Sequence, residues 1–206
     1  MRYERKVVLD RYVLGDVLST VLKNRAIFTK QFPDRKVNSI YLDTIDFNAL
    51  QMNLKGISNR EKWRMRWYGN ASGQVPMTLE RKWKRNQLGG KDLHALGSYS
   101  TLSWPTAYRG ATQIIDYVFP VVMVSYDRQY YISTDQRIRL TVDTSIHYQK
   151  IVNEQVMFPP YEQPSVVVEF KYDEEDEQHA LDVISTMPFR ITKNSKFVNA
   201  MLTHWF

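Results

Sequence analysis

Residues 60–68 read Arg-Glu-Lys-Trp-Arg-Met-Arg-Trp-Tyr, and charged side chains alternate with apolar ones through this stretch. Successive side chains of a β-strand point to opposite faces of its sheet. Lys62, Arg64 and Arg66 would therefore share one face, while the tryptophans and the methionine between them share the other. The stretch predicts a strand with one cationic face and one face packed in a core.

The same alternation recurs in five more places along the chain. These are Glu4-Arg5-Lys6, Glu80-Arg81-Lys82-Trp83-Lys84, Arg128-Gln129-Tyr130, Arg137-Ile138-Arg139 and Glu169-Phe170-Lys171. Asp143 lies four residues after Arg139 and would therefore point to the same face. The charged positions are mostly basic, with only Glu4, Glu80, Asp143 and Glu169 acidic. Such a face repels itself unless an anionic ligand neutralises it, so the pattern indicates a polyanion as partner.

Bulk composition limits the class of protein. The chain has 206 residues, 43% of them hydrophobic, and a formal net charge of +6, which suits one basic domain over residues 1–206. The absence of cysteine excludes disulfides, thiolate metal sites and cysteine nucleophiles. The N-terminus lacks the apolar core of a signal peptide, and the apolar runs are too short to span a bilayer. We expect a soluble cytoplasmic protein, with a place at the inner face of a membrane left open.

Local patterns predict both strands and helices. Strands are expected at 2–9, 37–42, 60–68, 76–84, 121–132, 136–147 and 165–172, and helices at 10–23, 46–54, 107–117, 177–186 and 195–205. The loop at 70–73 would join two of the strands as a hairpin, whereas 86–101 is polar and patternless. Most connections are short enough for antiparallel pairing. The fold class is therefore α+β with one large antiparallel sheet.

Two arrangements of the charged face are open. In one, an exposed sheet carries ladders of salt bridges across its strands. In the other, eight antiparallel strands form a closed barrel with helices packed outside, and the charges line its interior. The second arrangement suits the like-signed arginines better, because a cationic interior must hold water, a metal ion and a polyanion.

The alternating stretches, taken in order, resemble the VTC domain, the polyphosphate polymerase branch of the triphosphate tunnel metalloenzymes, within the CYTH-like group. The resemblance rests on residues 4–6, 39–47, 60–68, 79–82, 126–128, 137–143, 168–171 and 193–197, which span nearly the whole chain. It implies a closed eight-stranded tunnel, ATP as phosphoryl donor, Mn²⁺ or Mg²⁺ as cofactor, and polyphosphate as product. A membrane-protein partner for product export is a further expectation.

The resemblance also implies roles for individual residues. The catalytic candidates are Arg64, Arg66, Lys82, Arg128 and Arg139. The substrate-binding candidates are Lys6, Lys62, Lys91, Tyr126, Lys171, Lys193 and Lys196, the last two near the tunnel mouth on the terminal helix. The metal-binding candidates are Glu169, Glu80 and Glu4.

Three other functions compete with the polymerase. A tunnel triphosphatase would hydrolyse triphosphate, polyphosphate or nucleotide, although the single glutamate Glu4 at the opening favours the polymerase branch. A non-catalytic receptor would bind polyphosphate or inositol phosphate without turnover. Nucleic acid is not expected as a partner, because Trp63, Trp67 and Trp83 lie on the face opposite the cations.

Overall fold

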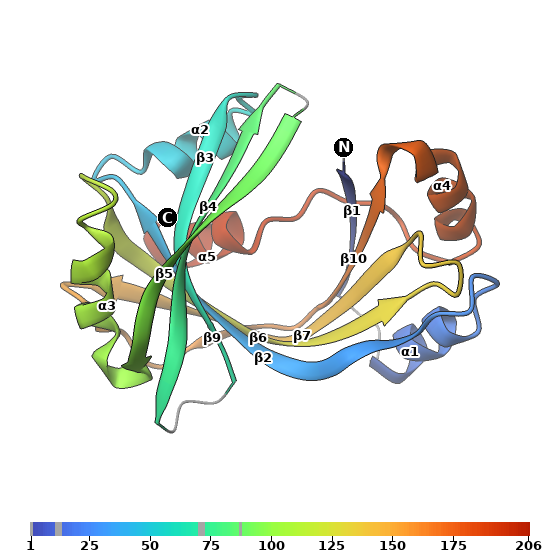
Figure 1. The fold of residues 1–206 in the computed structure, drawn as a ribbon, viewed down its shortest axis with the longest axis horizontal. Helices are drawn as coiled ribbons and strands as arrows, with labels where there is room; N and C mark the ends of the chain where they lie inside the picture. Colours follow the sequence, from blue (N-terminus) through green and yellow to red (C-terminus); the bar gives the residue numbers. More distant parts are fainter. Residues whose placement is uncertain (1, 11–13, 70–72, 87) are drawn as a thin grey trace. The chain divides into compact units, whose positions relative to one another are not determined.

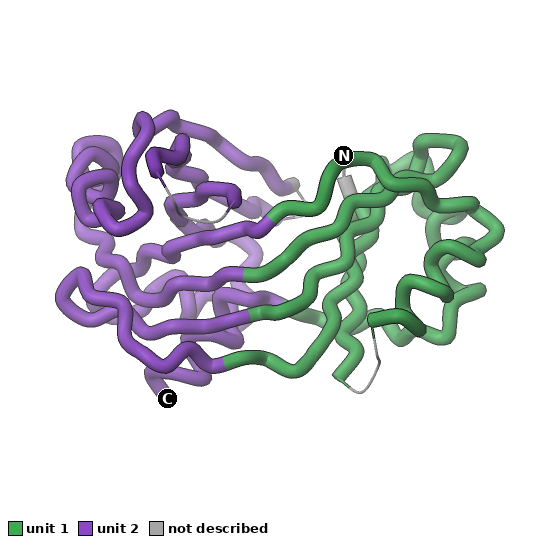
Figure 2. Tube along the Cα trace, turned by 90° about the horizontal axis from the view of Figure 1, so that it is seen from below, with its two compact units in different colours: residues 1–35, 126–146, 162–194 green, residues 36–125, 147–161, 195–206 purple. Residues whose placement is uncertain are grey.

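The computed structural model describes residues 2–10, 14–69, 73–86 and 88–206. They form two compact units, each assembled from three separate segments of the chain (Figure 2). Unit 1 comprises residues 1–35, 126–146 and 162–194, and unit 2 comprises 36–125, 147–161 and 195–206. Strands β2 (Thr29–Asp43), β6 (Phe119–Ile132) and β7 (Arg139–Val152) contribute residues to both units.

The remaining elements are seven strands, five α-helices and two 3₁₀ turns among the described residues (Figure 1). The other strands are β1 (Arg2–Leu9), β3 (Arg60–Tyr68), β4 (Gln74–Arg85), β5 (Leu88–Ser100), β8 (Gln155–Val156), β9 (Tyr161–Gln163) and β10 (Val166–Asp173). The α-helices are α1 (Leu14–Leu22), α2 (Asn48–Leu54), α3 (Trp104–Ala111), α4 (Glu177–Ser185) and α5 (Lys196–Trp205), with short 3₁₀ turns η1 (Thr101–Ser103) and η2 (Glu174–Asp176). Among the described residues, no helix has the length and hydropathy needed to cross a bilayer.

The sheet is open, so the predicted closed barrel is wrong. Among the described residues the paired strands run β1-β10-β7-β6-β2-β3-β4-β5, and the path ends at β1 and β5. The outer edge of β1 is bonded elsewhere, because the backbone N–H of Thr192 donates to the carbonyl of Lys6 at 2.7 Å. A short segment thus covers an edge that closure would have covered. The antiparallel α+β class itself is confirmed.

Unit 1 packs the apolar face of β1, β10 and β7 beneath two helices. Val7, Val168 and Leu140 each have one charged neighbour in the chain and are completely buried. Val17 of α1 and Val183 of α4 belong to the same hydrophobic cluster. Burying aliphatic side chains in this way is the main stabilising contribution to the unit. The alternation predicted for these strands is therefore confirmed.

Unit 2 repeats this arrangement on β2, β3 and β4. Ile40, Met65 and Leu79 occupy neighbouring positions on these strands and have no exposed surface. They form one cluster with Trp67 and with the inward face of α3, including Ala107. Trp67 is thus a core residue, as its position opposite the cations predicted.

The polar stretch at 86–101, expected to be without regular structure, contains β5. Its residues pair with β4 from Leu88 opposite Arg85 to Ser100 opposite Gln74. Gly90 lies opposite Trp83, and a Cβ atom on Gly90 would fall 2.3 Å from Cζ2 of the indole ring. The absence of a side chain at Gly90 therefore leaves room for the Trp83 ring. Pairing with β4, rather than local strand propensity, makes residues 88–100 a strand.

Smaller differences concern helix and turn boundaries. The helix expected at 107–117 is α3, which begins earlier and ends at Ala111. Pairing of β3 with β4 confirms the hairpin, whereas most of its predicted loop, 70–72, lies outside the described residues. The helix expected from residue 46 begins at Asn48, because the Asp43 carboxylate accepts hydrogen bonds from the N–H groups of Ala49 at 2.8 Å and Leu50 at 3.1 Å.

Candidate functional site

Unit 2 carries a row of like charges across three neighbouring strands. Lys62 of β3 lies directly opposite Lys82 of β4, and Lys82 lies directly opposite Lys91 of β5. Cβ atoms of directly opposed residues are about 4.5–5.5 Å apart, and like charges in such pairs destabilise a sheet. A row that repels itself in this way favours an anion placed along it. We call Lys62, Lys82 and Lys91 the lysine row.

A buried carboxylate organises the arginines beside the lysine row. Oε2 of Glu80 accepts hydrogen bonds from Nε and Nη2 of Arg64 at 2.8 and 2.6 Å, and Nη1 of Arg66 lies 3.8 Å from the same oxygen. Lys91 Nζ lies 3.6 Å from Oε1. Burial alone would raise the pKa of Glu80, but Arg64 and Arg66 outweigh it and hold the pKa below its ordinary value. Glu80 is therefore an ionised anchor that orients the surrounding cations.

Two neutral residues that were not among the predicted site residues complete this cluster. Arg64 Nη1 donates to the Tyr41 hydroxyl at 3.1 Å, and Arg66 donates to Oγ of Ser39 from Nε at 3.1 Å and from Nη2 at 3.0 Å. Burial would raise the pKa of Tyr41, yet Arg64 and Arg66 outweigh it and lower the pKa. The signal was present in the sequence, because Ser39 and Tyr41 alternate with the apolar residues of β2.

The start of α5 brings further groups to the same cluster. Lys62 Nζ donates to Oγ of Ser195 at 3.0 Å and lies 5.4 Å from the centre of the Phe197 ring. Lys196, the first residue of α5, lies close enough to lower the pKa of Tyr41. Lys193 does not lie on this helix as predicted, since the helix begins at Lys196 and Lys193 belongs to unit 1.

Unit 1 has a second buried carboxylate among cations. Glu169 of β10 forms an ion pair with Lys171, and its Oε2 lies 3.8 Å from Lys6 Nζ. Lys6 Nζ is also 2.7 Å from the Glu4 carboxylate. Burial would raise the pKa of Glu169, but Lys171, Lys6 and Arg128 outweigh it, and the pKa lies well below its ordinary value. Glu169 is therefore a carboxylate, not a carboxylic acid, at neutral pH.

A bidentate ion pair holds Arg128 in place on the same face. Its Nε and Nη2 donate to the two carboxylate oxygens of Asp143 at 2.6 and 2.8 Å, and Asp143 has no exposed surface. Burial would lower the pKa of Arg128, whereas Asp143 raises it well above its ordinary value. The guanidinium lies 5.1 Å from the ring centre of Tyr126. Arg139 is exposed and lies directly opposite Lys171.

The structure thus gathers the predicted residues into two groups, one in each unit. The unit 2 face consists of Lys62, Arg64, Arg66, Glu80, Lys82, Lys91 and Lys196. The unit 1 face consists of Glu4, Lys6, Tyr126, Arg128, Arg139, Asp143, Glu169 and Lys171. The unit 2 face is almost wholly cationic, whereas the unit 1 face nearly balances its charges. Each group has several donors suited to phosphate oxygens.

A divalent metal ion would need ligands from a bound phosphate substrate as well as from the protein. Within residues 2–10, 14–69, 73–86 and 88–206, no group of three or more His, Cys, Asp or Glu side chains could hold an ion. Mg²⁺ and ions like it commonly take one or two carboxylates and complete their shell with phosphate oxygens and water. An ionised Glu169 supplies a carboxylate of this kind. The residues of unit 1 therefore fit an ion that is shared with a phosphate ligand.

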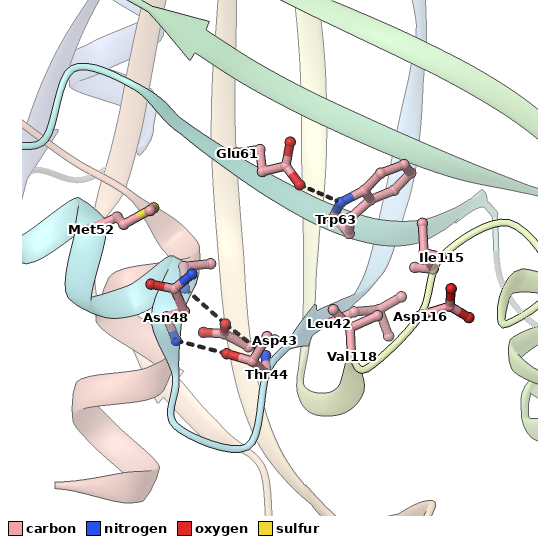
Figure 3. A pocket seen from close by; sticks show the side chains of 11 residues that line it. Leu42, Asp43, Thr44, Asn48, Met52, Glu61, Trp63, Ile115, Asp116 and Val118 are labelled. Carbon is pink, nitrogen blue, oxygen red and sulfur yellow. Dashed lines mark hydrogen bonds between the residues drawn. The ribbon is translucent and has the colours of Figure 1, made fainter.

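A pocket of about 270 Å³ in unit 2 lies on the side of β3 opposite the charged face (Figure 3). Glu61 and Trp63 line it, and both alternate along β3 with the residues of the charged face. Two of its acidic groups are already engaged: Glu61 accepts a hydrogen bond from Trp63 Nε1 at 3.1 Å and pairs with Arg81, while Asp43 caps α2. The pocket is therefore separate from the cationic face.

Comparison with solved structures shows the same fold in proteins of very different sequence. The PH1819 protein from Pyrococcus horikoshii OT3 matches with a TM-score of 0.59 at 10% identity, covering 99% of this chain and 100% of that one. A putative adenylyl cyclase from Hippeastrum, described as having a dominant triphosphatase activity, matches with a TM-score of 0.56 at 13% identity, over 100% and 98%. A putative adenylate cyclase from Vibrio parahaemolyticus gives 0.54 at 10% identity, over 96% and 98%.

Comparison at the level of sequence families is more specific. No curated protein matches the chain significantly. The family model of the VTC domain matches residues 1–101 and 110–204, which is nearly the full length and includes every residue of both charged faces. This match confirms the resemblance inferred from the alternating stretches. The chain therefore belongs to the VTC domain family.

Proposed function

We propose that this protein is a polyphosphate polymerase that transfers the γ-phosphate of ATP to the end of a growing polyphosphate chain. The observation that carries the proposal is the lysine row beside the Arg64–Glu80–Arg66 cluster. A chain of phosphates has a negative charge at each unit and can contact several cations in succession. Membership of the VTC family supports the same assignment.

In the proposed reaction a terminal phosphate oxygen of the acceptor attacks the γ-phosphorus of ATP. The bond from that phosphorus to the bridging oxygen breaks, ADP leaves with the bonding electrons, and the acceptor becomes one phosphate longer. The acceptor oxygen is already ionised at neutral pH, so no strong base is needed. The protein's task is to position the reactants and neutralise charge, which is how phosphoryl transfer is usually catalysed.

The arginines, the lysines and the residues that hold the arginines serve different parts of this task. Arg64 and Arg66 present planar guanidiniums that suit two phosphate oxygens at once, while the lysine row supplies point charges. Glu80, Ser39 and Tyr41 hold the arginines in position before any substrate binds. Such preorganisation matters because donors that are already oriented need not rearrange when charge develops on the transferring phosphate.

The proposed cofactor is Mg²⁺ or Mn²⁺, and Glu169 is the residue that would hold it. When bound, such an ion would neutralise phosphate charge and polarise the phosphorus–oxygen bonds. Glu169 suits this role because it is ionised and buried, and because Lys171 and Lys6 keep its carboxylate oriented. Glu80 and Glu4 are further candidates, and like Glu169 each already faces cations in its own unit.

A triphosphatase is the second candidate, because one structure of this fold is described as having a dominant triphosphatase activity. The same cations would then bind triphosphate, and water would replace the phosphate acceptor. Nucleic acid remains an unexpected ligand under either proposal. Trp67 is buried in the core and Trp63 lies on the face opposite the cations, so neither supports base stacking beside the charged groups.

The products formed from ATP distinguish the candidates. The purified protein would be incubated with ATP and Mg²⁺ or Mn²⁺, and the products separated on a gel that resolves polyphosphate by length. We expect a ladder of long, phosphatase-sensitive polymer together with ADP. Free phosphate without polymer would instead identify a triphosphatase, and tight binding of polyphosphate without turnover would identify a receptor. A protein that neither binds nor converts these anions would contradict the whole proposal.

A further inference from the structure

The hydroxyl of Thr141, on β7 in unit 1, has no hydrogen-bond partner although it is buried. It is one of the few buried side-chain oxygen or nitrogen atoms among the described residues for which no partner is present. Buried polar groups are nearly always hydrogen bonded, because leaving one unpaired costs stability. Valine has almost the same shape and β-branched stiffness without that cost. A bound water or a ligand atom would supply the missing partner.

The position of Thr141 places it within the unit 1 face. It lies directly opposite Glu169 of β10, which in turn lies opposite Lys6 of β1. Arg139 and Asp143 are two positions away on the same strand and therefore point to the same side. Thr141 has Leu140 and Val142 as its chain neighbours, and both point to the core. The hydroxyl thus belongs to the charged side of the sheet.

The neighbouring carboxylates do not use this hydroxyl. Glu169 forms ion pairs with Lys171 and Lys6, and Asp143 accepts hydrogen bonds of 2.6 and 2.8 Å from Arg128. The cations of these pairs have long, flexible side chains, and the Lys171 side chain is 39% exposed. Lys171 can therefore turn toward a ligand without a movement of the backbone.

We propose that the Thr141 hydroxyl donates a hydrogen bond to a phosphate oxygen of the substrate bound at the unit 1 face. The ligand is an anion because Lys6, Lys171, Arg128 and Arg139 outnumber the three carboxylates of that face. Phosphate oxygens accept hydrogen bonds from hydroxyls as well as from cations. This inference rests on the proposed function, in which the substrate is a chain of phosphates. Thr141 is thereby a substrate-binding residue in addition to those recognised from charge alone.

The test measures binding of tripolyphosphate by calorimetry, without divalent metal, to the wild type, Thr141→Val and Thr141→Ser. A hydrogen bond to a charged group corresponds to roughly a tenfold or greater change in affinity, so we expect Thr141→Val to bind at least about tenfold more weakly. Thr141→Ser keeps the hydroxyl and should bind like the wild type. Thr203→Val is the matched control, because the Thr203 hydroxyl donates to the Asn199 carbonyl at 2.9 Å in α5, in the other unit.

Thermal unfolding without ligand gives an independent readout. If the hydroxyl has no partner in the free protein, Thr141→Val should unfold at the same temperature as the wild type or higher. A lowered melting temperature with unchanged affinity would show a structural role and overturn the inference. Thr141→Ala serves as a second hydroxyl-free variant if valine does not fit. Equal binding by wild type and variants overturns only this inference, whereas a wild type that does not bind tripolyphosphate overturns the proposed function as well.

Discussion

Replacing Arg66 with alanine is expected to lower ATP-dependent product formation by about a hundredfold to a thousandfold, the usual effect of removing one preorganised charge-stabilising group. The Arg66 side chain is only 8% exposed, and its guanidinium is held by Ser39 at 3.0 and 3.1 Å. This geometry fixes a planar donor beside the lysine row. The rate of product formation at saturating ATP measures the effect.

The fold should survive this substitution, which is why Arg66 is preferred to Arg64 as the test. Glu80 keeps its hydrogen bonds of 2.6 and 2.8 Å from Arg64 when Arg66 is removed, since Arg66 lies at 3.8 Å. Arg81→Ala is the matched control, because Arg81 lies on the neighbouring strand β4 of unit 2 but pairs with Glu61 on the opposite face. Wild-type turnover by Arg66→Ala, or an equal loss of turnover in Arg81→Ala, would contradict a role of the unit 2 face in the reaction.

Replacing Glu169 with glutamine is expected to abolish metal-dependent turnover, because the amide lacks the negative charge proposed to hold the ion. The measurement is the rate of product formation as a function of Mg²⁺ or Mn²⁺ concentration. Glu175→Gln is the control, since Glu175 is exposed in η2 of the same unit. An unchanged metal dependence in Glu169→Gln would exclude Glu169 as the metal-binding residue.

Glu169→Gln should also change how the free energy of unfolding depends on pH, because glutamine cannot ionise. The folded-state pKa of Glu169 lies well below the value of about 4.3 expected for an unfolded chain, so its carboxylate stabilises the fold above that pH. This contribution is lost as the pH falls through the folded-state pKa. The difference in unfolding free energy between wild type and variant should therefore be largest near neutral pH and shrink in acid.

The size of that difference depends on what the remaining cations can do. Removing one partner of a fully buried ion pair costs about 3–5 kcal/mol. Here the side chains of Lys171 and Lys6 are 39% and 24% exposed, so both ammonium groups can turn toward water. We expect a smaller loss of about 1–3 kcal/mol, the range for a buried polar group that loses its partner. Denaturant unfolding at a series of pH values measures it, and a difference independent of pH would contradict the assigned ionisation.

Strand alternation made the two faces of the sheet predictable from sequence. Met65 and Leu79 are core residues, while Arg64 and Glu80 meet on the other side, because side-chain direction repeats every second residue. The grouping of most charged candidates follows from this simple rule. Their individual roles in binding or catalysis remain predictions.

Register and closure were not predictable, because they depend on partners distant in the chain. The lysine row exists only if β3, β4 and β5 pair in one particular register, and a shift by one residue would turn every side chain to the other face. At the β1 edge, Lys6 forms a bridge with Thr192, and no local sequence pattern predicts this contact between residues so far apart in the chain. Ser39 and Thr141 carry no charge, so their alternation with apolar residues places them on the charged face without indicating which groups they would contact.

A structure of the protein with tripolyphosphate bound would test most directly whether the charged side of these strands binds phosphate. We expect phosphate oxygens within hydrogen-bonding distance of Arg64 or Arg66 and of Lys82 in the lysine row. Tripolyphosphate bound only elsewhere, such as in the pocket beside Trp63, with both charged faces free of phosphate, would contradict it.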